Sequence, residues 1–409
     1  MTSIDVAAVK ADFPILGREV NGHRLVYLDS ASSSQKPRPV VDAMTRYYET
    51  THANVHRGVY TIAEEATRLF EEGRARMARF LNARQSREIV FTKNVTEAIN
   101  LVAGSWGRAN LGAGDAVLLT EMEHHANLVP WLMLAQERGI QLRYLPVTDD
   151  GLLDLSDLER LVDGVKLVGV TCMSNVLGTI NPVREIADAA HAAGALCLAD
   201  AAQLVPHMAT DVQALGVDFL GFTGHKMLGP TGIGGLWARA DLLEEMPPFL
   251  GGGEMISDVR LDGFSTNEIP WKFEAGTPPI AEAVGLGVAV EYLENLGMDA
   301  VRAHEIELTT YALETLRERH DDLVIYGPHD AAGRGGVLSM QLADIHAHDL
   351  SQVLDQSGVC VRAGHHCAKP LMRRFGVSAT ARASLYIYND RSDVDELSEA
   401  LAEARKFFA

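Results

Sequence analysis

The sequence predicts an α/β fold with a mostly parallel sheet flanked by helices in a large domain, followed by a smaller C-terminal α/β domain. Short apolar runs typical of buried strands, such as 116–120 and 166–173, alternate with helix-like stretches. Two consecutive runs, 196–199 and 218–222, are followed by polar residues, as expected at the ligand-binding edge of such a sheet. A separate pattern of helices and strands begins near residue 299 and indicates the second domain.

Length and charge limit the possible classes of protein. A chain of 409 residues is long enough for two or three domains with a large buried core. The net charge of −19 argues against nucleic acid and anionic membrane surfaces as partners. No run approaches the ~18 apolar residues of a membrane span, and the first twelve residues lack the pattern of a signal peptide. We therefore expect a cytoplasmic protein whose four cysteines are buried, catalytic or metal-binding rather than disulfide-paired.

The expected elements follow from apolar periodicity and turn signals. After a helical start, the large domain should have helices at 40–50, 61–81, 98–104 and 283–296, and strands at 25–28, 88–92, 116–120, 142–147, 166–173, 196–199, 218–222 and 235–238. The second domain should have helices at 299–319, 349–357 and 392–408, and strands at 323–326, 336–342, 359–362 and 383–388. We place an N-terminal arm that packs with the small domain at 1–16, the large domain at 17–290 and the small domain at 291–409.

The ends of two neighbouring strands carry the strongest functional signal. Asp200 opens the tetrapeptide Asp-Ala-Ala-Gln, and Lys226 closes Thr-Gly-His-Lys. Pyridoxal phosphate requires a lysine for covalent attachment and an acidic partner for its ring nitrogen. Taken singly, Asp200 could cap a helix and Lys226 could lie on the surface. Together, the two residues favour a pyridoxal phosphate site.

The stretch RAGHHCAKPL, residues 362–371, is the second decisive one. Its cysteine, Cys367, is surrounded by cationic side chains that lower a thiol pKa and favour the reactive thiolate. Histidine and thiolate also suit zinc, so His365, His366 and Cys367 could instead form a metal cluster, although adjacent residues rarely converge on one tetrahedral ion. Cys360 alternates within an expected strand, which favours a packing role.

These stretches resemble the aminotransferase class V family, whose members are pyridoxal phosphate-dependent transferases of fold-type I, and within it the cysteine desulfurases. The motif R-x-G-H-H-C-A-x-P-L is similar to the cysteine loop of the group II, SufS-type enzymes, and the likeness extends over nearly the whole chain. The resemblance implies a homodimer that converts L-cysteine to L-alanine. Sulfur would pass to an enzyme persulfide and then to iron–sulfur cluster assembly.

The resemblance also implies roles for individual residues. Lys226 would hold the cofactor and take the Cα proton, Cys367 would attack the substrate sulfur, and His124 would stack on the cofactor ring, with His125 as the alternative. The other cofactor-binding residues would be Thr96, Asp200, Gln203, Thr223, His225 and, acting across the dimer interface, Thr277. The substrate-binding residues would be Asn175, Arg382, Arg362, His56 and Arg57. Helix N-termini bind phosphate, which suits Thr96, and a guanidinium grips a carboxylate by two bonds, which suits Arg382.

Two alternatives to a cysteine desulfurase remain open on the sequence. A selenocysteine lyase would use the same residues, and a non-catalytic, metal-binding interaction protein would use His365, His366 and Cys367 as ligands. A desulfurase with so short a cysteine loop would need a sulfur-acceptor protein, of the SufE or SufU type, to approach it. The acidity of the chain favours an acceptor with a basic face. His346 and His348 are either cap-region residues or, for His348, part of the docking site.

Overall fold

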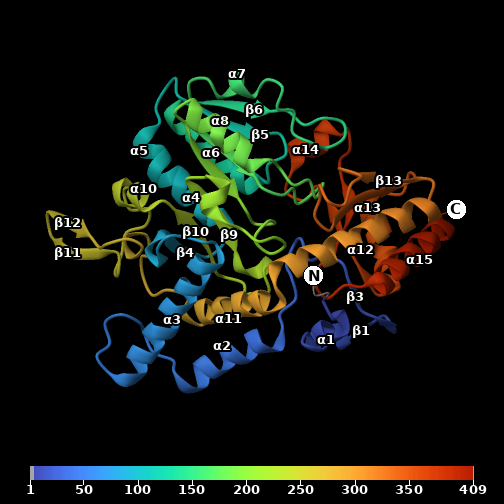
Figure 1. Ribbon diagram of the computed structural model, residues 1–409, viewed down its shortest axis with the longest axis horizontal. Helices are drawn as coiled ribbons and strands as arrows, with labels where there is room; N and C mark the ends of the chain where they lie inside the picture. The colour runs from blue at the N-terminus through green and yellow to red at the C-terminus, as the bar shows by residue number, and fades with distance from the viewer. Residues whose placement is uncertain (1–3, 409) are drawn as a thin grey trace.

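The computed structural model describes residues 4–408, and its centre is a seven-stranded sheet with strand order β4-β10-β9-β8-β7-β5-β6 (Figure 1). Neighbouring strands are parallel except at β10, which runs antiparallel to both β4 and β9. The strands are β4 (Ile89–Thr92), β5 (Ala116–Thr120), β6 (Gln141–Leu145), β7 (Val165–Thr171), β8 (Leu196–Asp200), β9 (Phe219–Thr223) and β10 (Gly234–Ala238). The prediction of a mostly parallel sheet is confirmed.

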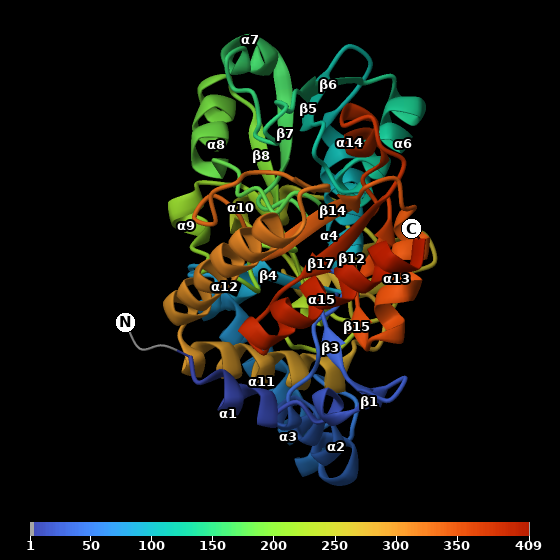
Figure 2. The ribbon, with the colours of Figure 1, turned by 90° about the vertical axis from the view of Figure 1, so that its right-hand side faces the viewer.

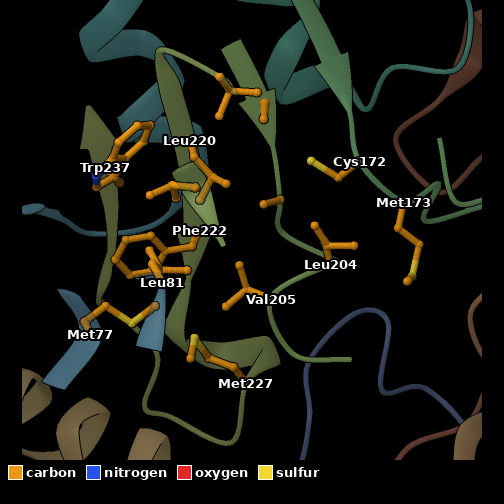
Figure 3. Close-up of a cluster of buried hydrophobic side chains, with 14 of the residues drawn as sticks. Met77, Leu81, Cys172, Met173, Leu204, Val205, Leu220, Phe222, Met227 and Trp237 are labelled. Carbon is orange, nitrogen blue, oxygen red and sulfur yellow. The ribbon is translucent and has the colours of Figure 1, made fainter. Parts of the chain in front are cut away.

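Most of this sheet is buried on both faces, which explains why its strands are continuously apolar. Alternate side chains of β9 enter different cores: Leu220 and Phe222 belong to one cluster, and Phe219 belongs to the other. Figure 3 shows Leu220 and Phe222 of the first cluster together with Met77. Each such side chain contributes about 1.5–3 kcal/mol through burial.

Helices cover both faces of the large sheet. The first cluster includes side chains of α3 (Thr61–Phe80), α8 (Val183–Ala192) and α11 (Ile280–Leu296), and α11 packs against both α3 and α2 (Arg38–Thr50). The second cluster includes side chains of α4 (Val95–Val102), α6 (Val129–Arg138) and α10 (Ala240–Glu245). The shorter helices of this part are α5 (Arg108–Asn110), α7 (Leu158–Val162) and α9 (Val212–Leu215).

The C-terminal part is built on a four-stranded antiparallel sheet in the order β13-β14-β17-β16. Its strands are β13 (Leu323–Tyr326), β14 (Val337–Leu342), β16 (Arg362–Gly364) and β17 (Thr380–Ser384). Side chains of α12 (Met298–Arg319), α13 (Ala347–Gln356) and α15 (Arg391–Phe408) pack with those of the sheet in one core, and Figure 2 shows α12 and α15 side by side. The short helix α14 (Lys369–Arg374) follows the cysteine loop.

The beginning of the chain contacts this C-terminal part. Lys10 of α1 (Val6–Ala11) lies 2.5 Å from Asp390 and 3.1 Å from Asp393, at the start of α15. Strand β3 (Val26–Tyr27) pairs in parallel with β15 (Val359–Cys360) rather than with the large sheet. Residues 1–3 and 409, which belong to the predicted arm and small domain, lie outside the described residues. The domain boundaries at 16/17 and 290/291 stay predictions.

Some elements differ from the sequence-based expectation. The segment 251–277 offered few structural signals, yet it contains a hairpin of β11 (Ile256–Arg260) and β12 (Gly263–Thr266), which projects at the left of Figure 1. The hairpin strands are largely exposed, so they lack the buried alternation that reveals a strand. The last strand was expected at 383–388, but β17 runs from Thr380 to Ser384. The apolar residues 385–388 follow the strand and are buried in the core, so their apolar character reflects burial rather than strand pairing.

A two-residue turn joins β1 (Glu19–Val20) and β2 (His23–Arg24). Asn21 and Gly22 both have positive φ, as a tight hairpin turn with this sequence requires. Between residues 4 and 408, no helix combines the length and the apolar character that crossing a bilayer would take.

Candidate active site at the carboxyl edge of the sheet

The predicted lysine and aspartate lie in one cavity at the carboxyl ends of the parallel strands. Asp200 is the last residue of β8 and is buried, and Lys226 lies in the 3₁₀ turn directly after β9. Asp200 and Lys226 line this cavity with His124, Asn175 and Gln203. Because carboxyl ends of neighbouring parallel strands meet at one edge, residues far apart in the sequence converge here.

Burial and mutual charge shift the pKa values of Lys226 and Asp200 in opposite directions. Burial lowers the pKa of Lys226 to about 8, while the nearby Asp200 carboxylate opposes that shift. Burial raises the pKa of Asp200, while a hydrogen bond from the Ala202 N–H and the charge of Lys226 oppose the rise. A lysine with a pKa near 8 is partly neutral at physiological pH, as an amine must be to bond to a carbonyl carbon or accept a proton.

The structure distinguishes the two adjacent histidines. His124 lines the cavity, and burial, followed by the charge of Lys226, lowers the pKa of its ring to about 3. Its Nδ1 accepts a hydrogen bond from the Ala126 N–H at 3.0 Å, so the neutral ring carries its proton on Nε2. His125 contacts the cysteine loop instead. Its backbone N–H donates to the Cys367 carbonyl at 2.7 Å, and its ring Nε2 accepts a hydrogen bond from the Lys369 backbone N–H at 3.1 Å. His125 therefore supports the cysteine loop.

Unpartnered polar atoms test whether this site suits pyridoxal phosphate. Among the residues that the structure describes, Gln203 Oε1 and Thr223 Oγ1 are buried without a hydrogen-bond partner. Gln203 is oriented by a bond from its Nε2 to the Ala31 carbonyl at 2.7 Å. Two buried polar atoms without partners, near the Lys226 amine and the Asp200 carboxylate, fit a polar aromatic cofactor that would form hydrogen bonds with them.

The start of α4 and the turn before Lys226 carry further residues that are predicted to bind the cofactor. Thr96 is exposed in the first turn of α4, and Asn94 caps that helix by accepting the Glu97 N–H at 3.0 Å. Free N–H groups at such a terminus favour a phosphate. The pKa of His225 falls to about 4 because the ring is desolvated and faces the charges of Lys226 and Lys36.

Asn175 and Arg382 link the cavity to the C-terminal sheet. Arg382 of β17 is almost fully buried, and its Nη1 donates to the Asn175 carbonyl at 2.9 Å. The Nδ2 of Asn175 in turn donates to the His366 carbonyl at 2.7 Å. Arg362 of β16 lies directly across from Arg382 in the sheet register and is half exposed. The structure therefore brings Asn175, Arg382 and Arg362 together, and their role in binding the substrate stays a prediction.

Cys367 lies on an exposed loop with an unusual backbone. Cys367 and the preceding His366 both have positive φ, at 54° and 49°, a region that costs most side chains about 1 kcal/mol or more. The Cys367 N–H donates to His365 Nδ1 at 3.1 Å, and the Cys367 carbonyl is held by His125. The loop thus displays a thiol to solvent while its backbone is anchored to the residues beside the cavity.

The geometry of the histidines gives no support to a metal centre. His366 is buried, and its Nε2 lies 2.9 Å from Thr380 Oγ1. Burial, followed by the charge of Arg382, lowers the pKa of His366 to about 3. Among residues 4–408, no group of three or more histidine, cysteine, aspartate or glutamate side chains is placed to hold a metal ion.

Of the residues predicted from the resemblance, Lys226, Asp200, His124, Asn175 and Gln203 line the cavity, whereas His56, Arg57 and Thr277 have their contacts elsewhere within one chain. His56 Nε2 lies 3.0 Å from Glu71 Oε1, and Arg57 Nε lies 3.3 Å from Glu254. Thr277 lines a different cavity of about 400 Å³ near the start of α4. The roles of His56, Arg57 and Thr277 stay predictions, which depend on a second copy of the chain.

Comparison with known proteins places the chain in a family. The model of the aminotransferase class V family matches residues 26–397. The chain belongs to this family. It is 52% identical to a probable cysteine desulfurase of Streptomyces coelicolor over 99% of this chain and 98% of that protein. It is 49% identical to a cysteine desulfurase of Haloferax volcanii, with the same two coverages.

Solved structures of this aminotransferase class V family share the fold. The apo cysteine desulfurase of Thermococcus onnurineus matches with a TM-score of 0.94 and 40% identity, covering 99% of this chain and all of that one. The S-sulfonic acid form of the Escherichia coli cysteine desulfurase CsdA matches with a TM-score of 0.91 and 38% identity, with the same coverages. The predicted family and fold-type are confirmed.

Two carboxylates beside the site of this family member were not expected from the sequence. Glu123 is fully buried next to His124, and its oxygens accept bonds from Thr120, Asn127 and Thr171 at 2.8–2.9 Å. Burial raises its pKa to about 8. Asp29, on the loop after β3, lies against both Arg362 and Arg382. The available signals were only that Glu123 adjoins His124 and that Asp29 directly follows the expected strand at 25–28.

Proposed function

We propose that this protein is a pyridoxal phosphate-dependent cysteine desulfurase, a transferase that converts L-cysteine to L-alanine and keeps the sulfur as a persulfide. The observation that carries the proposal is the placement of two reactive groups. A lysine with a pKa of about 8 lies in a cavity with Asp200 and His124, and the Cys367 loop is bonded to Asn175 of that cavity and to His125 beside it. Relatives at 49–52% identity over nearly the full chain are named cysteine desulfurases.

The residues around Lys226 fit the cofactor. Lys226 would attach it, Asp200 would keep its ring nitrogen protonated, Gln203 would meet its ring oxygen, and His124 would lie on its ring face. The phosphate-binding residues would be Thr96, Thr223, His225 and, from a second copy in a homodimer, Thr277. When bound, pyridoxal phosphate supplies an electron sink that makes the Cα proton of an amino acid acidic.

Lys226 and Cys367 would then divide the work on the substrate. The Lys226 amine would accept the Cα proton, a task for which a pKa near 8 suits neutral pH. The Cys367 thiolate would bond to the substrate sulfur as the Cβ–S bond breaks, and the bonding electrons would stay on Cβ, which takes up one proton to become the methyl group of alanine. Enzyme thiol and cysteine thus yield enzyme persulfide and alanine, with every atom accounted for.

Arg382, Arg362 and Asn175 would hold the substrate. A guanidinium fork binds a carboxylate by two parallel bonds, and Arg382 is fixed by the Asn175 carbonyl. His56 and Arg57 would contribute from the facing copy of a dimer.

The destination of the sulfur follows from the position of Cys367. The loop is anchored through Asn175 and His125, so a persulfide on Cys367 cannot travel far, and an acceptor of the SufE or SufU type would come to it. His348, which stacks on His346 at the exposed start of α13, is a docking candidate. The motif around Cys367 supports group II membership and a role in iron–sulfur cluster assembly. Four free cysteines suit the reducing cytoplasm.

The test is turnover of the purified protein loaded with pyridoxal phosphate. With L-cysteine and a reductant we expect equal amounts of alanine and sulfide, and a basic acceptor protein should accelerate the reaction. Turnover with L-selenocysteine far above that with L-cysteine would instead assign a selenocysteine lyase. A loaded protein that releases neither product from either substrate would refute the proposal.

A further inference from the structure

Two arginines face each other across the β16–β17 pair, beside the cavity. Arg362 and Arg382 are direct partners in the register of these antiparallel strands. Like charges directly opposite each other in a sheet are destabilising unless a countercharge lies between them. The structure supplies that countercharge from a segment more than 300 residues earlier in the chain, since the Asp29 carboxylate contacts both side chains.

Asp29 makes a two-pronged contact with one arginine and a single contact with the other. Its Oδ1 and Oδ2 each lie 3.2 Å from Arg362 Nε, and Oδ2 lies 3.0 Å from Arg362 Nη2. Its Oδ1 lies 3.3 Å from Arg382 Nη2. The carboxylate thus binds the half-exposed Arg362 more closely than the buried Arg382.

The Asp29 carboxylate is held in place from its own side. Ser32 Oγ donates to Asp29 Oδ1 at 2.7 Å, and Ser32 Oγ itself accepts a hydrogen bond from Arg382 Nη2 at 2.6 Å. The Asp29 backbone bridges to Ser384 at the end of β17, two residues beyond Arg382. Asp29 is therefore a fixed part of the arginine pair rather than a surface carboxylate that meets it by chance.

One donor of Arg382 is left open by this arrangement. Nη1 is bonded to the Asn175 carbonyl and Nη2 to Ser32, but Nε is buried without a partner among the described residues. An unpartnered guanidinium N–H in a buried position is costly unless a ligand meets it. Burial lowers the pKa of Arg382 to about 10, a shift that Asp29 opposes and Arg362 reinforces. With two arginines and one aspartate, the group keeps a net charge of +1.

We propose that Asp29 is a positioning residue that holds Arg362 and Arg382 together and sets the anion affinity of the pair, so that the site takes one carboxylate group and releases it readily. The inference rests on the proposed function, in which Arg382 receives the carboxylate of the amino acid. Asp29 weakens anion binding through its charge while it fixes the geometry of the donors. A purely structural aspartate would only fix the geometry of the arginines, so removing its charge would weaken anion binding. If Asp29 also lowers the anion affinity, removing its charge should strengthen anion binding.

Propionate is the probe, because it has the carbon skeleton of alanine and a single carboxylate. Its dissociation constant is measured by NMR titration of the full-length protein, with and without bound pyridoxal phosphate. Asp29→Asn should bind propionate about tenfold more tightly than the unaltered protein, since a negative charge a few ångströms from the anion is removed in a partly screened site. Asp29→Glu, which keeps the charge, should return the dissociation constant to within about twofold of the original.

The charge argument also predicts a compensating pair. Arg362→Gln should weaken propionate binding by about tenfold, and the double variant Asp29→Asn/Arg362→Gln should bind propionate nearly as the unaltered protein does. Arg382→Met should abolish binding, which locates the probe. If Asp29→Asn alone does not fold, the double variant must still bind propionate more tightly than Arg362→Gln does.

Unchanged or weaker binding in Asp29→Asn, or a double variant no tighter than Arg362→Gln, would overturn the inference and leave Asp29 as scaffold. The propionate titration without pyridoxal phosphate makes the test of Asp29 independent of the proposed function. A protein that never turns over L-cysteine could still show the Asp29 effect, and an active desulfurase could lack it.

Discussion

The cavity around Lys226 and the loop around Cys367 provide two very different settings for reactive groups. The cavity sits on the buried ends of β8 and β9, where desolvation shifts the pKa values of Lys226 and His124 far from their usual range. Cys367 is exposed, and its backbone is held in the left-handed region. In the proposed function, proton chemistry benefits from a dry, fixed site, whereas the sulfur would have to leave the enzyme and would therefore need an accessible thiol. Burial sets the pKa values of the groups in the cavity, whereas the backbone of the loop sets how far the Cys367 thiol is exposed.

The comparison predicts that the largest effect comes from the buried lysine. Lys226→Ala should reduce alanine formation by at least about a thousandfold, because in the proposed function one amine both attaches the cofactor and moves the proton. Thermal unfolding should show an intact fold, since Lys226 borders a cavity and its loss leaves no apolar void. Lys166→Ala, at an exposed lysine near the start of β7, is the matched control and should retain full activity. Cofactor still covalently attached in Lys226→Ala would assign its attachment to another lysine.

The exposed thiol can be separated from the buried site by a second substitution. Cys367→Ser should load pyridoxal phosphate normally, yet lose at least about a hundredfold in alanine and sulfide formation. Cys360→Ser is the control, because Cys360 is half-buried in β15 and burial raises its thiol pKa. Absorbance of the bound cofactor and alanine analysis measure the two properties independently. Alanine formation near the original rate in Cys367→Ser would show that the two regions are not divided in this way.

The tuning by burial makes a pH-dependent prediction. In protein without cofactor, trapping of Lys226 by a small aldehyde and a reductant should rise with pH through a midpoint near 8, because only the neutral amine reacts. Asp200→Asn should move this midpoint down by about one pH unit, since the Asp200 charge stabilises the protonated amine. Mass spectrometry of the peptide containing Lys226 follows the trapping at each pH. A midpoint near 10 in the unaltered protein would show that burial does not tune this amine.

The smallest effect is expected from the carboxylate behind His124. Because burial raises the pKa of Glu123 to about 8, the unaltered protein should lose about 1–3 kcal/mol of unfolding free energy relative to Glu123→Gln as the pH rises from about 5 to 8. Glu137→Gln, at an exposed carboxylate paired with Arg108, should show no such change relative to the unaltered protein over this range. Urea unfolding at both pH values measures the two variants. The same pH dependence in Glu123→Gln and in the unaltered protein would show that burial does not raise the pKa of Glu123.

The sequence predicted those features that depend on local pattern. Asp200 and Lys226 could be placed at one edge because each directly follows an apolar strand, and parallel strands end at the same edge. Cys367 could be singled out because its cationic neighbours are adjacent in sequence. The whole sheet of the large part could be expected for the same reason, since its strands are short, apolar and bounded by polar turns.

What depends on long-range contact could not be predicted. Asp29 meets Arg362 and Arg382 through contacts that span more than 300 residues, and no periodicity reveals such a partner. Strand β3 looked like any other short apolar run, yet it pairs with β15 in the C-terminal part. The predicted roles of Thr277 and Arg57 would need a second chain, about which one sequence carries no geometric information.

The central claim, a buried site that releases sulfur to an exposed thiol, is tested most directly by locating the sulfur after a single turnover. Loaded protein is mixed with less than one equivalent of L-cysteine, quenched with an alkylating agent and analysed by peptide mass spectrometry together with the alanine released. The account predicts one extra sulfur atom on the peptide containing Cys367, in an amount equal to the alanine formed. Alanine formed with no extra sulfur on Cys367, or with that sulfur on Cys360, would contradict it.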